Sequence, residues 1–148
     1  MTDDQIVDGI LAAEGGFVDD PSDRGGATHH GITIATLSRW IGRDATVQDV
    51  RDLPIATARA IYQHLYLAPF AGLDADVKPQ VVDIAVTSGV LKARQLLALA
   101  QQQTARPVGV QLVIERLRYV ARIVRTDPSQ AKWILGWINR AVLFLETP

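Results

Sequence analysis

The sequence has no cysteine, no long uninterrupted hydrophobic run and no low-complexity segment, and each absence excludes a class of protein. Without cysteine, the 148-residue chain forms no disulfide, no thiolate metal site and no cysteine nucleophile. The longest apolar stretch, residues 133–145, contains Asn139 and Arg140 and is too short to cross a bilayer. The acidic N-terminus lacks the positive charge of a signal peptide, so we expect a protein without membrane insertion and without its own export signal.

Hydrophobic residues make up 48% of the chain, which is enough for one compact globule or for two small lobes that share a core. The net charge of −1 conceals an uneven distribution. Residues 1–23 contain seven acidic and no basic side chains, whereas residues 92–148 contain nine basic and three acidic ones. Two solvated faces of one fold account for this asymmetry, and a basic surface for an anionic polymer is the alternative.

Helical signals dominate the chain, and we predict a mainly α fold. A capping-box pattern at Thr2 starts a helix that Gly15 and Gly16 end. Further helices are predicted over residues 34–41, 54–67, 79–103 with a break or kink at residues 88–89, 108–125 and 128–146. Between the first two helices, residues 15–32 form a long glycine-rich connection, of which part can pair as a short hairpin. Long loops inside small domains are often functional.

Glu14 is the strongest candidate for a catalytic residue. It follows Val7, Ile10 and Leu11 at helical spacing, so it continues the apolar stripe of the first helix. It also falls at the predicted C-terminal end of that helix, where the helix dipole disfavours negative charge. Partial burial also disfavours the negatively charged form of the carboxyl group. A carboxyl group that stays protonated near neutral pH can serve as a general acid, although an isolated glutamate at a helix end is usually an ordinary surface residue.

The loop after Glu14 supplies candidates for a second catalytic group. Asp19, Asp20, Asp23 and Thr28 all follow within fourteen residues of Glu14. Cleavage of a glycosidic bond commonly pairs one acid with a second carboxylate that activates water or stabilises the cationic transition state. The loop therefore indicates a glycosidase.

Residues 13–33 read AEGGFVDDPSDRGGATHHGIT and resemble the signature of glycoside hydrolase family 108, a family of peptidoglycan muramidases that includes phage endolysins and secretion-associated lysozymes. The resemblance implies a lysozyme-like helical fold with Glu14 as the catalytic acid. Together with Glu14, Asp23 and Thr28 are similar in position to the Glu, Asp and Thr of phage-type lysozymes, with one residue fewer between Asp23 and Thr28. Asp20 is the other candidate for the second carboxylate.

The resemblance continues along the chain. Residues 61–66 resemble the tyrosine-containing helix of the family, which implies substrate contacts for Tyr62 and Tyr66. Residues 83–89 are similar to an Asp-x-Ala-Val-Asn-x-Gly segment, with Thr87 in place of Asn. Residues 118–119 and 136–140 resemble the associated peptidoglycan-binding region. We therefore predict a catalytic region over residues 1–91 and a shortened peptidoglycan-binding-like region over residues 92–148, packed as one globule.

The remaining candidates have competing interpretations. His29 and His30 replace the polar pair that is usual before Gly31. The sequence pattern offers no third converging ligand, so we expect no metal. His30 is a candidate hydrogen-bond donor in the substrate groove. Trp137 suits core packing, with sugar stacking as the alternative. The arginines of residues 118–125 could line a nucleic-acid-binding face, but a solvated helix face explains them, and we predict no nucleic acid.

These observations together predict an N-acetylmuramidase that cleaves the β-1,4 bond between N-acetylmuramic acid and N-acetylglucosamine without a cofactor. Its partner would be the glycan strands of peptidoglycan. We expect a monomer, made in the cytoplasm and delivered to the periplasm and cell wall by a holin or another secretion route. Two alternatives stay open at this point: a lytic transglycosylase, and a non-catalytic helical module that binds peptidoglycan or serves as a scaffold.

Overall fold

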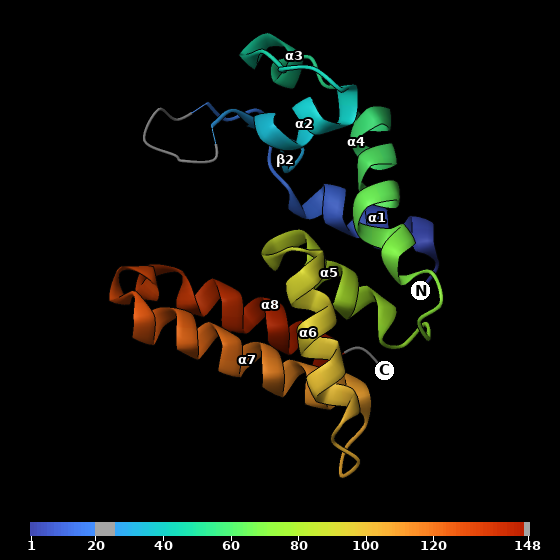
Figure 1. The fold of residues 1–148 in the computed structure, drawn as a ribbon, viewed down its shortest axis with the longest axis vertical. Coiled ribbons are helices and arrows are strands. Elements are labelled where there is room, and N and C mark those ends of the chain that lie inside the picture. The colour runs from blue at the N-terminus through green and yellow to red at the C-terminus, as the bar shows by residue number, and fades with distance from the viewer. Residues whose placement is uncertain (20–25, 147–148) are drawn as a thin grey trace. The chain divides into compact units, whose positions relative to one another are not determined.

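A computed structural model describes residues 1–19 and 26–146, and its chain forms two compact units, Met1–Ala71 and Gly72–Pro148 (Figure 1). The described part contains eight α-helices and one two-stranded antiparallel sheet, which confirms the predicted mainly α fold. The units divide at residue 71, within the region that we predict to be catalytic. The functional regions 1–91 and 92–148 stay predictions.

The first helix, α1 (Asp3–Ala13), begins as the sequence predicts. The Thr2 hydroxyl accepts from the backbone N–H of Gln5, while the Gln5 side chain accepts from the N–H of Thr2. One face of α1 is buried, and it consists of Ile6, Val7, Ile10 and Leu11. Burying a side chain of this size contributes roughly 1.5–3 kcal/mol, so this face anchors the helix that leads to Glu14.

A short hairpin follows in the glycine-rich connection, as predicted. Strands β1 (Thr28–His29) and β2 (Ile32–Thr33) pair in antiparallel register, with Thr28 opposite Thr33 and His29 opposite Ile32. Thr33 then caps α2 (Ile34–Ile41), which ends at Gly42 in the left-handed conformation. The buried Ile32 fixes the hairpin to the core of this unit.

Three helical segments complete the first unit. A capping box at Thr46 starts α3 (Val47–Arg51), and Pro54 precedes α4 (Ile55–Tyr62). The chain then continues through a π-helical turn, Gln63–Leu67, and a 3-10 turn, Ala68–Phe70. Helix α4 packs against α1, and Arg59 on α4 forms an ion pair with Asp8 on α1.

The second unit consists of α5 (Lys78–Ser88), α6 (Val90–Gln101), α7 (Val108–Thr126), a 3-10 segment (Pro128–Trp133) and α8 (Ile134–Glu146). Each α-helix packs against the next one in the chain. Gly89 separates α5 from α6 at φ 87° and ψ 151°, which confirms the predicted break. Figure 1 shows α7 and α8 lying side by side. None of the helices in residues 1–19 and 26–146 is long and apolar enough to span a membrane.

Candidate active site

Glu14 lies where α1 ends. Its backbone N–H donates to Ile10 O at 3.0 Å, so it still belongs to the helical hydrogen-bond pattern. Its own backbone, at φ −84° and ψ 140°, is already extended. The side chain is half-buried, which agrees with its predicted position at the edge of the buried stripe. The carboxyl group is therefore presented by a rigid helix and remains partly open to solvent.

Gly31, in the turn of the hairpin, lies directly against the Glu14 side chain. A Cβ atom at residue 31 would lie 2.8 Å from both Cγ and Oε2 of Glu14, and closer still to the hydroxyl oxygen of Tyr62. Real Cβ atoms essentially never approach other atoms so closely, so any other residue here would displace the side chain of Glu14 or of Tyr62. The missing side chain is therefore what allows the carboxyl group to pack against the turn.

The turn itself has an uncommon backbone conformation. His30 and Gly31 both have positive φ, 50° and 73°, as a two-residue type I′ hairpin turn requires. Positive φ is uncommon for a residue other than glycine, so His30 needs support from its surroundings. Tyr62 supplies it: the Tyr62 hydroxyl donates to His30 O at 2.9 Å. Helix α4 thus holds the turn in place beside Glu14.

The two histidines of the hairpin stack on each other, with ring centroids 4.0 Å apart. The His29 ring nitrogen Nδ1 lies 3.1 Å from Val50 O, which ties this ring to α3. Burial lowers the pKa of His30 below its usual 6.5, and the neighbouring His29 lowers it further. His30 is therefore kept neutral near pH 7, with a half-buried ring that can donate one hydrogen bond.

Thr28 is the first residue of β1, and its backbone pairs with the segment that follows Glu14. The backbones of Val18 and Thr28 exchange two hydrogen bonds of 2.8 Å. The Thr28 hydroxyl donates to Gly26 O at 3.2 Å. Asp20 and Asp23, the two candidates for the second carboxylate, lie outside the described residues. Asp19, which precedes them, is exposed.

The structure brings several predicted residues together in the first unit. Glu14 lies against the turn that contains His30, and the hydroxyl of Tyr62 supports that turn. Tyr62 is itself 1% exposed, and its ring lies 5.6 Å from that of the half-buried Tyr66. Trp137 belongs to the second unit. The substrate contacts of His30, Tyr62, Tyr66 and Trp137 and the catalytic roles of Glu14 and Thr28 stay predictions.

Two features of this site were not predicted from the sequence. One is the contact between Gly31 and Glu14, and the other is the support of the turn by Tyr62. The Gly-Ile-Thr motif at residues 31–33 and the adjacent His-Gly pair were the available signals for a tight hairpin. No group of three or more potential metal ligands gathers anywhere in the described ranges 1–19 and 26–146.

This geometry presents a helix-anchored, half-buried carboxyl group beside a rigid turn, which is an arrangement suited to general acid catalysis. The sequence comparison gives the class: the family model described as glycosyl hydrolase 108 matches residues 7–89, and the protein belongs to this family. It is a glycoside hydrolase of a family that acts on peptidoglycan. The matched segment contains Glu14, the hairpin and α4.

A solved structure resembles the whole chain. The structure of SagA from Brucella abortus aligns with a TM-score of 0.81 at 28% sequence identity, and the match covers 95% of this chain and 90% of that one. The similarity therefore extends through both compact units. None of the curated proteins matches the sequence.

Proposed function

We propose that this protein is a lysozyme-type N-acetylmuramidase that hydrolyses the β-1,4 bond between N-acetylmuramic acid and N-acetylglucosamine. The family supports glycoside hydrolysis. The observation that carries the proposal is the contact between Glu14 and Gly31, because it orients a half-buried carboxyl group that a helix and a hairpin both hold. Preorganisation of this kind is what a general acid needs.

In the proposed reaction, Glu14 donates its proton to the glycosidic oxygen as the bond from that oxygen to the anomeric carbon breaks. The positive charge that develops on the sugar is stabilised by a second carboxylate, Asp23 or Asp20, which alternatively orients the attacking water. Thr28 would position that water through its hydroxyl group. Water supplies the new hydroxyl at the anomeric carbon, and its remaining proton returns to a carboxylate. The scheme requires no cofactor.

The second carboxylate can be identified with three matched variants. We expect Asp23→Asn to lower kcat by about 10²-fold or more, because a positioned acid–base group contributes on the order of 10²–10⁴-fold. Asp19→Asn, an exposed neighbour of the same type, should leave kcat within about twofold. The measurement is release of reducing ends from purified peptidoglycan. A large loss in Asp20→Asn with none in Asp23→Asn would assign the role to Asp20.

Product analysis separates the proposal from its alternatives. Hydrolysis at muramic acid gives muropeptides with a reducing muramic acid end, whereas a lytic transglycosylase gives an anhydro product without consuming water. A non-catalytic module would sediment with insoluble peptidoglycan and release no fragment between pH 5 and 8. Mass spectrometry of the soluble digest distinguishes these outcomes. Delivery by a holin or another secretion route, and a monomeric state, remain predictions of the sequence.

A further inference from the structure

A small aromatic cluster lies on the segment that directly follows Glu14, and the proposed hydrolysis does not use it. Its centre is Phe17, which is half-buried. The guanidinium carbon of Arg51, the last residue of α3, lies 4.1 Å from the centre of the Phe17 ring. The rings of Phe17 and His29 meet at 87°, with their centres 6.2 Å apart. The first geometry is that of a cation–π contact, and the second is that of an edge-to-face aromatic pair.

The cluster continues to the hairpin turn that touches Glu14. The His29 ring stacks on that of His30. The next residue, Gly31, lies against the Glu14 side chain. The contacts therefore close a ring, which runs along the chain from Glu14 to Phe17, across to His29 and back through the turn. A displacement of Phe17 would consequently reach the carboxyl group both along the chain and through the turn.

Phe17 is the first side chain after Glu14 that can hold this segment. The two residues between them are Gly15 and Gly16, which have no side chain and are exposed. A Cβ atom at either glycine would meet nothing within 4 Å, so no neighbouring atom restrains them closely. The position of the chain where it leaves Glu14 therefore depends on the contacts of the Phe17 ring.

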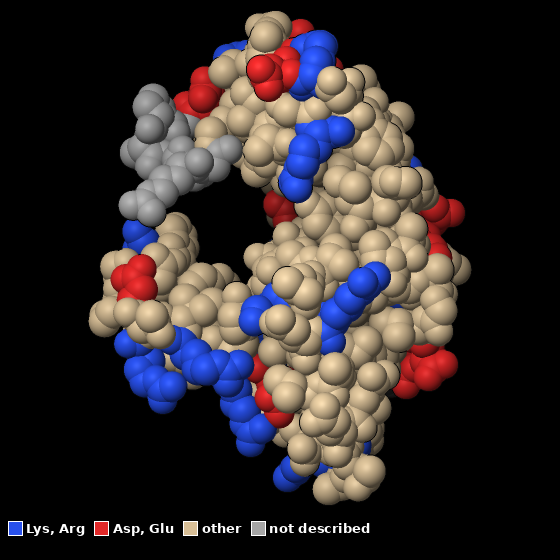
Figure 2. Space-filling model, viewed as in Figure 1, with Lys and Arg blue, Asp and Glu red and all other residues tan. Residues whose placement is uncertain are grey.

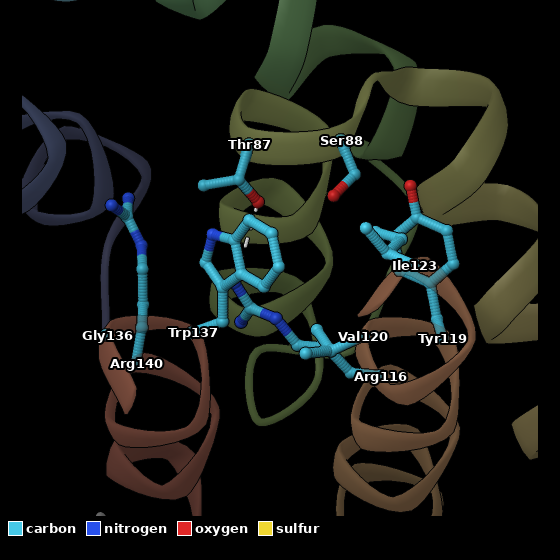
Figure 3. A pocket seen from close by; sticks show the side chains of 9 residues that line it. All are labelled: Thr87, Ser88, Arg116, Tyr119, Val120, Ile123, Gly136, Trp137 and Arg140. Atoms are coloured by element: carbon cyan, nitrogen blue, oxygen red, sulfur yellow. Dashed lines mark hydrogen bonds between the residues drawn. The ribbon is translucent and has the colours of Figure 1, made fainter. Parts of the chain in front are cut away.

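Arg51 has no carboxylate partner in the part of the chain that the structure describes. Other arginines have one: Arg116, which lines a pocket of the second unit, pairs with Asp83 (Figure 3). Basic side chains also gather at the surface over α7, where water solvates them (Figure 2). The Arg51 guanidinium lies instead on an aromatic ring, so Phe17 is the group on which its charge acts.

We propose that Arg51 is a positioning residue for the reaction at Glu14. The proposal rests on the proposed function, because it gives Arg51 a part in that same reaction without contact to the substrate. By holding Phe17, the guanidinium group fixes the segment after Glu14. Through Phe17 and His29 it also steadies the turn that packs against the carboxyl group. Helix α3 thereby supports the catalytic acid through two aromatic side chains.

Five variants separate this role from a general effect on stability. Arg51→Gln removes the cation, whereas Arg51→Lys keeps a cation that can still lie over the ring. Phe17→Leu removes the ring and both of its contacts, whereas Phe17→Tyr keeps the ring. Arg43→Gln is the matched control. It breaks another contact of α3, the ion pair with Asp49, and leaves the Phe17 ring and its two contacts in place.

The first measurement is the rate of hydrolysis of soluble peptidoglycan fragments by the full chain. We expect Arg51→Gln to lower kcat about three- to tenfold and to change KM less than about twofold, because a cation–π contact accounts for a factor of this size. Arg51→Lys, Phe17→Tyr and Arg43→Gln should stay close to the wild type. Phe17→Leu should lose about tenfold or more, since both contacts disappear. The double variant Arg51→Gln, Phe17→Leu should be no slower than Phe17→Leu, because Arg51 acts through that ring.

Hydrogen exchange measures the same contact without turnover. The backbone N–H groups of Val18 and Thr28 donate to each other's carbonyl oxygen at 2.8 Å, and these residues adjoin Phe17 and His29. We expect both amides to exchange about threefold faster or more in Arg51→Gln, and to recover in Arg51→Lys. The amide of Ile10 in α1 should keep its rate. A general loss of stability would accelerate Ile10 as well.

Three results would overturn the proposal: wild-type kcat in Arg51→Gln, losses that add in the double variant, or an equal loss in Arg43→Gln. These outcomes are distinct from failure of the proposed hydrolase. A wild type that releases no fragments, with exchange at Val18 that depends on Arg51, loses the muramidase and keeps the contact that holds the segment. A wild type that digests peptidoglycan no faster than Arg51→Gln does the reverse.

Discussion

Glu14 and Gly31 show how one side chain depends on the absence of another. The spacing of Glu14 from Val7, Ile10 and Leu11 was sufficient to predict a carboxyl group at the edge of the core. The contact with Gly31 could not be predicted in this way, because it depends on a hairpin that returns the chain to the end of α1. The nearest sequence signal, the His-Gly pair, indicates a tight turn at Gly31 and says nothing about its contact with Glu14.

Gly31→Ala should therefore impair activity beyond its effect on stability. The added Cβ would displace the Glu14 carboxyl group or the Tyr62 hydroxyl, so we expect kcat to fall by at least about tenfold, since misplacement of a catalytic group by about 1 Å can cost 10²-fold. The positive φ adds a backbone cost of roughly 1–2 kcal/mol in the free energy of unfolding. Steady-state kinetics and urea denaturation measure the two effects.

Gly42→Ala is the matched control for this variant. Gly42 has φ 72°, nearly the 73° of Gly31, but a Cβ there would meet no atom within 4 Å. The two variants should lose similar stability through the backbone, and only Gly31→Ala should lose activity. Wild-type kcat in Gly31→Ala would show that the contact does not position Glu14.

His30 gives the first unit a dependence on pH. Its pKa is lowered in the native state, so the unfolded chain binds the proton more readily. The free energy of unfolding should consequently fall as the pH drops below about 6.5. We expect the fall between pH 7.5 and 5.5 to be smaller in His30→Gln, and an NMR titration of His30 to have its midpoint below 6.5. A midpoint at or above 6.5 would contradict the assignment.

At the scale of elements, local signals predicted most of the helices. The capping box at Thr2 lies at the helix start where the sequence placed it, because caps act within three or four residues. The break at Gly89 was equally local. The cluster of Asp83 with Arg116 and Arg140 was not predicted, because its members come from three helices and meet only after the second unit has packed.

Asp83 should be critical for the stability of the second unit. Asp83→Asn keeps the size of the side chain but removes the carboxylate charge that pairs with both Arg116 and Arg140. Removing one partner of a buried ion pair costs roughly 3–5 kcal/mol. Because Arg140 is partly exposed, we expect the free energy of unfolding to fall by about 3 kcal/mol, at the lower end of this range. Chemical denaturation followed by circular dichroism gives this value.

The control is Arg43→Gln, which breaks the exposed ion pair between Arg43 and Asp49. Water solvates both of these groups, so we expect little change in stability. If Asp83→Asn were as mild as Arg43→Gln, the cluster would not stabilise the unit.

At the scale of the molecule, the functional regions 1–91 and 92–148 stay predictions, and the boundary between them need not coincide with residue 71, where the two compact units of the chain divide. The reason is that composition and motifs mark segments of similar function, and compactness depends on which helices share a core. Helices α5 to α8 pack in sequence in the second unit, so α5 belongs with them although the family match runs to residue 89.

The central claim is that Glu14 is the proton donor of a muramidase, and digestion of purified peptidoglycan by the wild type and by Glu14→Gln tests it most directly. The amide preserves shape but has no acidic proton, so we expect about 10²–10⁴-fold slower release of muropeptides with reducing muramic acid ends, at unchanged thermal stability. Asp19→Asn, an exposed carboxylate five residues away, should remain active. Wild-type rates in a folded Glu14→Gln protein would contradict the account.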